Sequence, residues 1–119
     1  MRTFGQVVGH LADSQYYYCS LASGGTKSGG GVEKNKSSKA DLVGSLKEAV
    51  AYCKEAYAGM TDAKGGETVK LMNTDFARVA VLAANTAHDC EHYGNLATYM
   101  RIKGIVPPTS GRSAEPAKK

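Results

Sequence analysis

FARVAVLAANTAHDCEHYGNL, residues 76–96, is apolar on nearly all sides over its first half and carries two histidines in its second half. Arg78 and Asn85 are the main interruptions of the apolar run. A helix that is apolar all round is normally surrounded by other elements. The stretch therefore predicts a helix that packs inside a helical bundle.

Along the chain, helical periodicity predicts three helices and no convincing strand. These helices span residues 3–23, 38–59 and 75–103. The first opens with a capping-box pattern from Thr3 to Gln6, and the second carries an apolar stripe from Leu42 to Met60. Gly104, followed by two prolines, ends the third. The predicted fold class is all-α, an up-down helical bundle.

Two segments of the chain are poor in apolar residues. Residues 23–38, SGGTKSGGGVEKNKSS, predict a mobile connection. Residues 109–119 predict a disordered tail, so we expect a helical domain over 1–106 and a tail over 107–119. Much of the basic charge lies in these segments and not on a folded face, so the net charge of +4 does not indicate nucleic-acid binding.

The sequence indicates the cellular compartment of the protein and the state of its cysteines. With 119 residues, the chain is large enough for one hydrophobic core. No apolar run approaches the roughly 20 residues that cross a bilayer, and the first residues lack the pattern of a signal peptide. We expect a cytoplasmic protein with no membrane partner. Cys19, Cys53 and Cys90 all fall in helical sequence and are expected to be buried free thiols rather than to form a disulfide.

The three histidines of the chain are His10, His88 and His92. On a helix, positions 88 and 92 lie one turn and about 40° apart, so both rings can face one centre. His10 lies at the margin of the apolar stripe of the first helix. Three converging histidines are typical of a metal site with open positions. Histidines on helices also simply pack, and spacing alone leaves both interpretations open.

The same stretch matches the H-x-x-E-H pattern of inverted zinc proteases, in which Glu91 would be the general base. That fold needs a further acidic ligand downstream, and after His92 the chain offers only Glu115. A protease is therefore not expected. Because Glu91 and Asp89 lie away from the ligand face, we assign no catalytic base.

Three segments resemble the DinB-like (also called YfiT-like) superfamily of metalloproteins. They are TFGQVVGHLADSQYYYCSLASG, SKADLVGSLKEAVAYC and NTAHDCEHYGNLATYMRIKGIVPPTS. The most specific parts are G-H-L-A-D and H-x3-H followed by Gly-Asn-Leu, where many relatives have Gly-Gln-Leu. The resemblance implies a four-helix bundle in which three histidines hold a divalent metal, zinc or nickel. Matched by motif, these ligands are His10, His88 and His92.

The resemblance also implies a range of functions. Members include thiol S-transferases and a thiol-dependent maleylpyruvate isomerase, which implies a metal-dependent transferase or hydrolase acting on a small-molecule thiol or electrophile. The alternative is a non-catalytic, oligomeric module for metal binding or interaction. Tyr17, Asn85 and Tyr99 are candidates for the substrate pocket, although a packing role suits each of them as well.

The resemblance also has an implication for assembly. Family members carry a helix before the T-F-G-Q segment, so the fourth-helix position is expected to be empty or filled by a partner subunit. Members are commonly dimers. Together with the helix that is apolar all round, this predicts a homodimer whose interface draws on Val79, Leu82 and Leu96.

Overall fold

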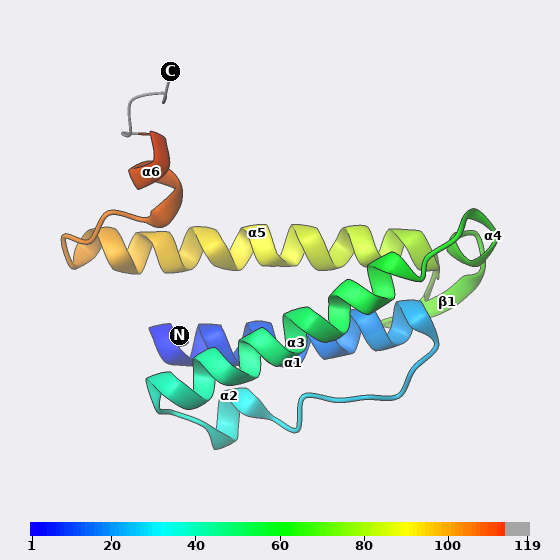
Figure 1. Cartoon of the computed structure of the whole chain (residues 1–119), viewed down its shortest axis with the longest axis horizontal. Helices are drawn as coiled ribbons and strands as arrows, with labels where there is room; N and C mark the ends of the chain where they lie inside the picture. The colour runs from blue at the N-terminus through cyan, green and yellow to red at the C-terminus, as the bar shows by residue number, and fades with distance from the viewer. Residues whose placement is uncertain (114–119) are drawn as a thin grey trace.

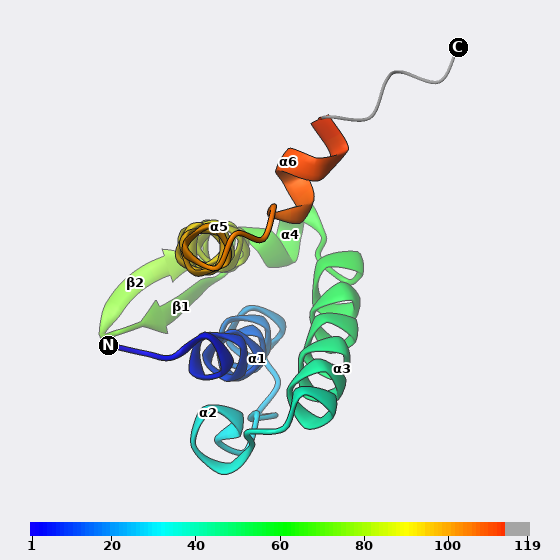
Figure 2. The same ribbon diagram turned by 90° about the vertical axis from the view of Figure 1, so that its left-hand side faces the viewer.

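Three long helices form the body of the protein, and the central one packs against both of the others. The computed structural model describes residues 1–113. Its elements are α1 (Phe4–Ser23), α2 (Val32–Asn35), α3 (Lys39–Ala58), α4 (Asp62–Gly65), β1 (Thr68–Leu71), β2 (Thr74–Ala77), α5 (Arg78–Ile102) and α6 (Pro108–Ser113). α1 lies between α3 and α5 (Figures 1 and 2). The predicted all-α class with three main helices is confirmed.

The predicted starts of the first two long helices agree with the observed caps. Thr3 Oγ1 accepts a hydrogen bond from the Gln6 amide at 3.2 Å, and Gln6 Oε1 accepts one from the Thr3 amide at 2.9 Å. Ser38 caps α3 by accepting from the Asp41 amide at 3.1 Å. These bonds satisfy amides that have no partner inside the helix. Within the described residues, no helix is apolar over a length sufficient for a membrane span.

The prediction of no strand is wrong for residues 68–77. β1 and β2 pair antiparallel, with Thr68 opposite Ala77. Met72 and Asn73 join them, and both have positive φ, as the central residues of a type I′ hairpin turn do. Because the hairpin takes up residues to 77, α5 begins at Arg78 and not near Asp75.

Two segments expected to lack structure contain short helices. The connection over residues 23–38 includes α2, whose Val32 is buried against α1 and α3. The expected tail contains α6 after a fully buried Pro107, so the expectation of disorder is wrong for this part. Residues 114–119, the rest of that tail, lie outside the described residues.

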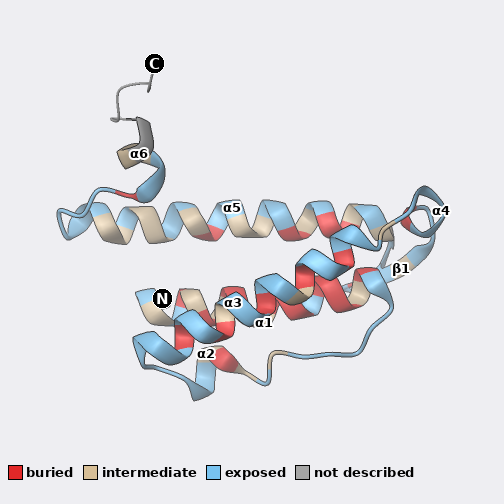
Figure 3. Ribbon diagram, in the orientation of Figure 1, coloured by how far each residue is buried: buried red, intermediate tan, exposed pale blue. Residues whose placement is uncertain are grey.

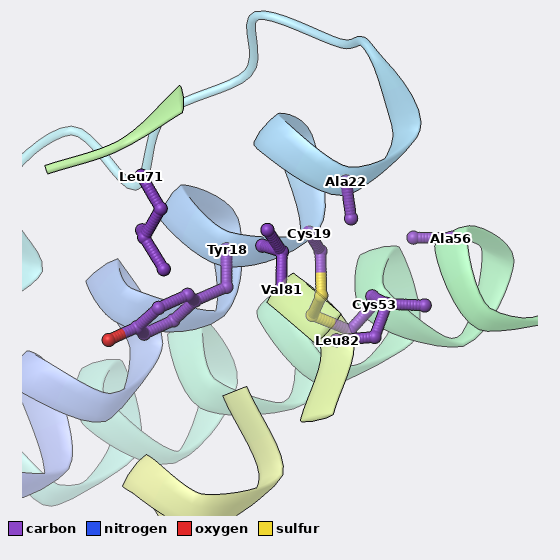
Figure 4. Packing of buried hydrophobic residues seen from close by; sticks show 8 residues of the cluster. All are labelled: Tyr18, Cys19, Ala22, Cys53, Ala56, Leu71, Val81 and Leu82. Atoms are coloured by element: carbon purple, nitrogen blue, oxygen red, sulfur yellow. A yellow bond between two sulfur atoms is a disulfide. The ribbon is translucent and has the colours of Figure 1, made fainter. Parts of the chain in front are cut away.

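A disulfide crosses the core between α1 and α3. Cys19 and Cys53 are bonded, with their Cα atoms 5.3 Å apart (Figure 4). The prediction of free thiols is therefore wrong for these two residues, since sequence spacing does not reveal which residues of two helices face each other. Cys90 is free, but it is exposed and not buried as predicted. The cluster around the disulfide also contains Tyr18, Ala22, Ala56, Leu71, Val81 and Leu82.

α5 is less surrounded than its sequence predicts. Val81, Leu82 and Asn85 are buried, but Val79 is 54% exposed. Phe76 is not part of the helix; it lies in β2 and is 37% exposed. The apolar segment therefore has one face in the core and the other on the surface, as the mixed colouring of α5 shows (Figure 3).

Candidate metal centre

One histidine of α1 and two of α5 bring their rings together. His88 Nε2 lies 3.2 Å from His10 Nε2 and 3.1 Å from His92 Nε2. One ring nitrogen from each histidine can be chosen so that all three lie within 4.8 Å of one another. His92 is buried and the other two are half-buried. The convergence expected from the spacing is thus observed, on two helices that pack directly against each other.

The donor chemistry of the cluster fits a metal ion. A neutral imidazole has one N–H group and one nitrogen with a free lone pair. His10 Nδ1 lies 3.2 Å from Glu33 Oε2, and an ionised carboxylate only accepts, so the proton belongs on Nδ1. The lone pair of His10 Nε2 therefore faces the other two rings. Three imidazole nitrogens suit zinc, nickel, copper or iron.

The cluster also disfavours protonation. Burial lowers the pKa of His10 below its ordinary 6.5; Arg2 lowers this pKa further, and the Glu33 carboxylate opposes the shift. Burial likewise lowers the pKa of His88, and its two neighbouring histidines add to the effect. Neutral imidazole is the form that binds a metal. At neutral pH the site therefore holds these two rings in the metal-binding form.

Two residues outside the predicted set contact the histidines. Glu33 accepts from Arg2 Nε at 2.7 Å in addition to contacting His10. Burial alone would raise the pKa of Glu33, but Arg2 and His10 hold it below its usual value. Asn95 Nδ2 lies 3.3 Å from His92 Nδ1. Sequence reasoning missed Glu33 because it stands in the Gly/Ser/Lys-rich segment, where Val32 beside it is the one apolar signal of a packed element.

A cavity of about 440 Å³ opens beside His92, between the start of α1 and the second half of α5. Its lining consists of Met1, Arg2, Val7, His92, Asn95, Thr98, Tyr99 and Ile102. This volume is within the range of small-molecule sites. The cavity therefore offers a substrate a place next to the histidine cluster.

The three predicted pocket residues lie in different surroundings. Tyr99 lines the cavity, and its hydroxyl donates to the Arg2 carbonyl oxygen at 2.5 Å. Asn85 is buried in the core, where its Nδ2 donates to Gln15 Oε1 at 3.2 Å. Tyr17 is exposed and lines a second, more open cavity against the Gly-rich loop. The structure thus brings Tyr99 to the histidine site and places Asn85 and Tyr17 elsewhere.

Neither acidic residue between the two histidines of α5 lines the cavity. Glu91 is exposed. Both oxygens of Asp89 lie 2.7 Å from Gln15 Nε2, and burial raises the pKa of this carboxyl. The placement agrees with the expectation that neither residue faces the centre, so the H-x-x-E-H pattern gains no support as a protease motif.

Comparison with known proteins agrees with the geometry of the site. No curated protein and no solved structure shows a significant match to the chain. The family model of the DinB superfamily matches residues 1–96, a range that contains His10, His88 and His92. Because this match covers most of the sequence, the chain belongs to the DinB superfamily.

Proposed function

We propose that this protein is a metal-dependent enzyme in which His10, His88 and His92 hold one divalent ion, either zinc or nickel. The observation that carries the proposal is the convergence of three imidazole nitrogens from two packed helices, all within 4.8 Å of one another. Three neutral imidazoles leave coordination positions open for water or a substrate.

The reaction that this site supports best is transfer involving a small-molecule thiol. When bound, a divalent ion supplies a positive charge that lowers the pKa of a coordinated thiol or water toward neutrality. The cavity beside His92 would hold the electrophile, with its apolar body against Val7 and Ile102. The thiolate sulfur would then form a bond to an electrophilic carbon of that substrate while the bond from that carbon to its leaving group breaks, and the leaving group would depart with that electron pair and take up a proton from water. We assign no catalytic residue from the chain.

A non-catalytic module for metal binding or assembly is the second candidate function. It is favoured by the lining of the cavity, which among the described residues contains no carboxylate that could act as a general base. In this case, the bound ion would only fasten α1 to α5. The fold and the ligands would be the same as in the enzyme.

Elemental analysis of protein purified without a histidine tag tests both candidates. We expect about one zinc or nickel ion per chain, and consumption of a thiol with an electrophile panel that stops when the metal is removed. Metal without any activity would favour the non-catalytic module. Absence of metal from protein refolded with either ion would contradict both.

We further propose a cytoplasmic homodimer without nucleic-acid or membrane partners. Exposed apolar side chains on α3 and α5, among them Val50 and Val79, support a second copy as the partner. The Cys19–Cys53 pair offers a test of the compartment, because disulfides are rare in reducing compartments. Thiol trapping during isolation of the protein tests the compartment, since a reduced pair is expected in the cytoplasm.

A further inference from the structure

The short helix α2 brings one carboxylate to the histidine cluster. Glu33 Oε2 lies 3.2 Å from His10 Nδ1, and Glu33 Oε1 accepts from Arg2 Nε at 2.7 Å. The side chains of Glu33 and His10 are only 24% and 22% exposed. Each carboxylate oxygen therefore has a partner, the His10 ring for one and the Arg2 guanidinium for the other. Because these side chains are largely covered, water screens the two interactions only partly.

The residues of α1 on either side of His10 fix the position of α2. Asp13 caps α2 by accepting from the Val32 amide at 2.9 Å and from the Glu33 amide at 3.0 Å. Gly9 allows a close approach of the two backbones, because a Cβ there would lie 2.7 Å from Glu33 Cα. The turn of α1 that presents His10 thus also holds the element that presents Glu33.

A ligating histidine works only when its proton is on the other ring nitrogen. The hydrogen bond made by that other nitrogen decides which tautomer is present. A carboxylate partner fixes the tautomer, orients the ring and raises the basicity of the ligand, and losing such a partner typically costs 10–100-fold in metal affinity. Glu33 stands where such a partner is needed.

We propose that Glu33 is a positioning residue for the metal centre: it accepts the Nδ1 proton of His10, so that the Nε2 lone pair points at the ion, while Arg2 holds the carboxylate in place. This inference rests on the proposed metal site. Glu33 does not touch the ion or a substrate. It acts through His10 alone.

Zinc affinity, measured by competition with a chromophoric chelator, is the first test. We expect Glu33→Ala to bind zinc about 10–100-fold more weakly than wild type. Glu33→Gln should lose less, because its amide oxygen still accepts from Nδ1. The matched control is Glu91→Gln, which removes an exposed carboxylate near the same histidines and should stay within about twofold of wild type.

The zinc affinities distinguish a failure of the proposed metal site from a failure of the proposed role of Glu33. A wild-type protein that binds no zinc would contradict the proposed metal site itself. Wild type and Glu33→Ala with equal zinc affinity would overturn the role of Glu33 and leave the metal site standing. A loss in Glu91→Gln equal to that in Glu33→Ala would also overturn it, because the effect would then come from net charge.

Nitrogen NMR of the His10 ring in the metal-free protein distinguishes positioning from a merely structural contact. Wild type and Glu33→Gln should both show a neutral ring with its proton on Nδ1, and Glu33→Ala should show proton density moved to Nε2. A wild-type ring with its proton on Nε2 would overturn the inference. This measurement on wild type and Glu33→Gln decides the question even if Glu33→Ala does not fold.

Discussion

At the scale of single residues, the histidines of the cluster should be indispensable for metal binding. His88→Ala removes one of three converging nitrogens, and because His88 is only half-buried and alanine favours a helix, helix content should stay close to wild type. The loss of zinc or nickel affinity should exceed the 10–100-fold typical of a lost outer partner. Elemental analysis measures the bound metal, and circular dichroism measures the helix content. Equal metal content in wild type and His10→Ala would contradict a three-ligand site.

The lowered pKa values of His10 and His88 predict how the metal-free protein responds to acid. Below pH 6.5, the unfolded chain takes up protons on these rings before the folded protein does. Folding stability should therefore be fully present above about pH 6.5 and should fall as the pH drops from 6.5 toward the folded-state pKa values. Urea unfolding of the metal-free protein at a series of pH values measures this. His88→Ala should weaken the dependence of stability on pH. A wild-type free energy of unfolding that stays constant between pH 7 and pH 5 would contradict this prediction.

The site was predictable from sequence where its residues are local or belong to a motif. His88 and His92 are one helical turn apart, so their proximity follows from helix geometry. The contribution of His10 rested on its G-H-L-A-D motif. Glu33 could not be predicted, because its contact with His10 depends on how the 25–31 connection folds back onto α1. A glutamate among glycines and lysines predicts a solvent-exposed charge in a loop.

At the scale of elements, the approach of α2 to α1 should depend on the absence of a side chain at Gly9. Gly9→Ala would place a Cβ 2.7 Å from the Glu33 backbone, so α2 must shift. We expect destabilisation by about 1–3 kcal/mol, as in other overpacked sites, together with weaker metal binding. Gly44→Ala is the control: its Cβ meets nothing within 4 Å on the exposed side of α3, and helix propensity should stabilise it by about 0.5–1 kcal/mol. Thermal unfolding compares the two variants, and an unaffected Gly9→Ala would show that α2 is not held against α1.

The long helices were predictable because their caps and apolar stripes are encoded locally. Thr3 and Ser38 both form the expected cap bonds. The hairpin was missed because each strand has four residues and the turn is Met72-Asn73, without the glycine that usually marks such a turn. The apolar residues Phe76 and Ala77 continue the pattern of α5, so no boundary between β2 and the helix was evident. Short strands give too little alternation to be separated from an adjoining helix.

At the scale of the whole molecule, the Cys19–Cys53 disulfide should contribute much of the stability. It links residues 34 apart in sequence, and a loop of this length corresponds to about 3–4 kcal/mol in the chain-entropy account. The double variant Cys19→Ala/Cys53→Ala should therefore unfold at a clearly lower urea concentration. Cys90→Ala removes the exposed free thiol and should change the unfolding midpoint little. An oxidised wild type no more stable than the double variant would contradict this contribution.

The outer faces of α3 and α5 lead to the prediction of a dimer. Val50 is 41% exposed and Val79 54% exposed, so burying each in an interface would recover about 1 kcal/mol. Leu82, expected in the interface, is instead buried within the chain, and Leu96 is half-buried. The contact surface should therefore involve Val79 and the apolar side of α3. A two-fold partner is the simplest one, because it buries the same patch on both chains.

Light scattering at micromolar concentration should give twice the 12.5 kDa mass of the chain. Val50→Glu and Val79→Glu each place a charge in the proposed contact surface. Both variants should become monomeric while staying folded, because both positions are on the surface of the chain. Ser28→Glu, in the exposed connection between α1 and α2, adds the same charge and should remain dimeric. If wild type is a cooperative monomer at these concentrations, the apolar faces of α3 and α5 are not joined by a second copy, and the three helices are stable without one.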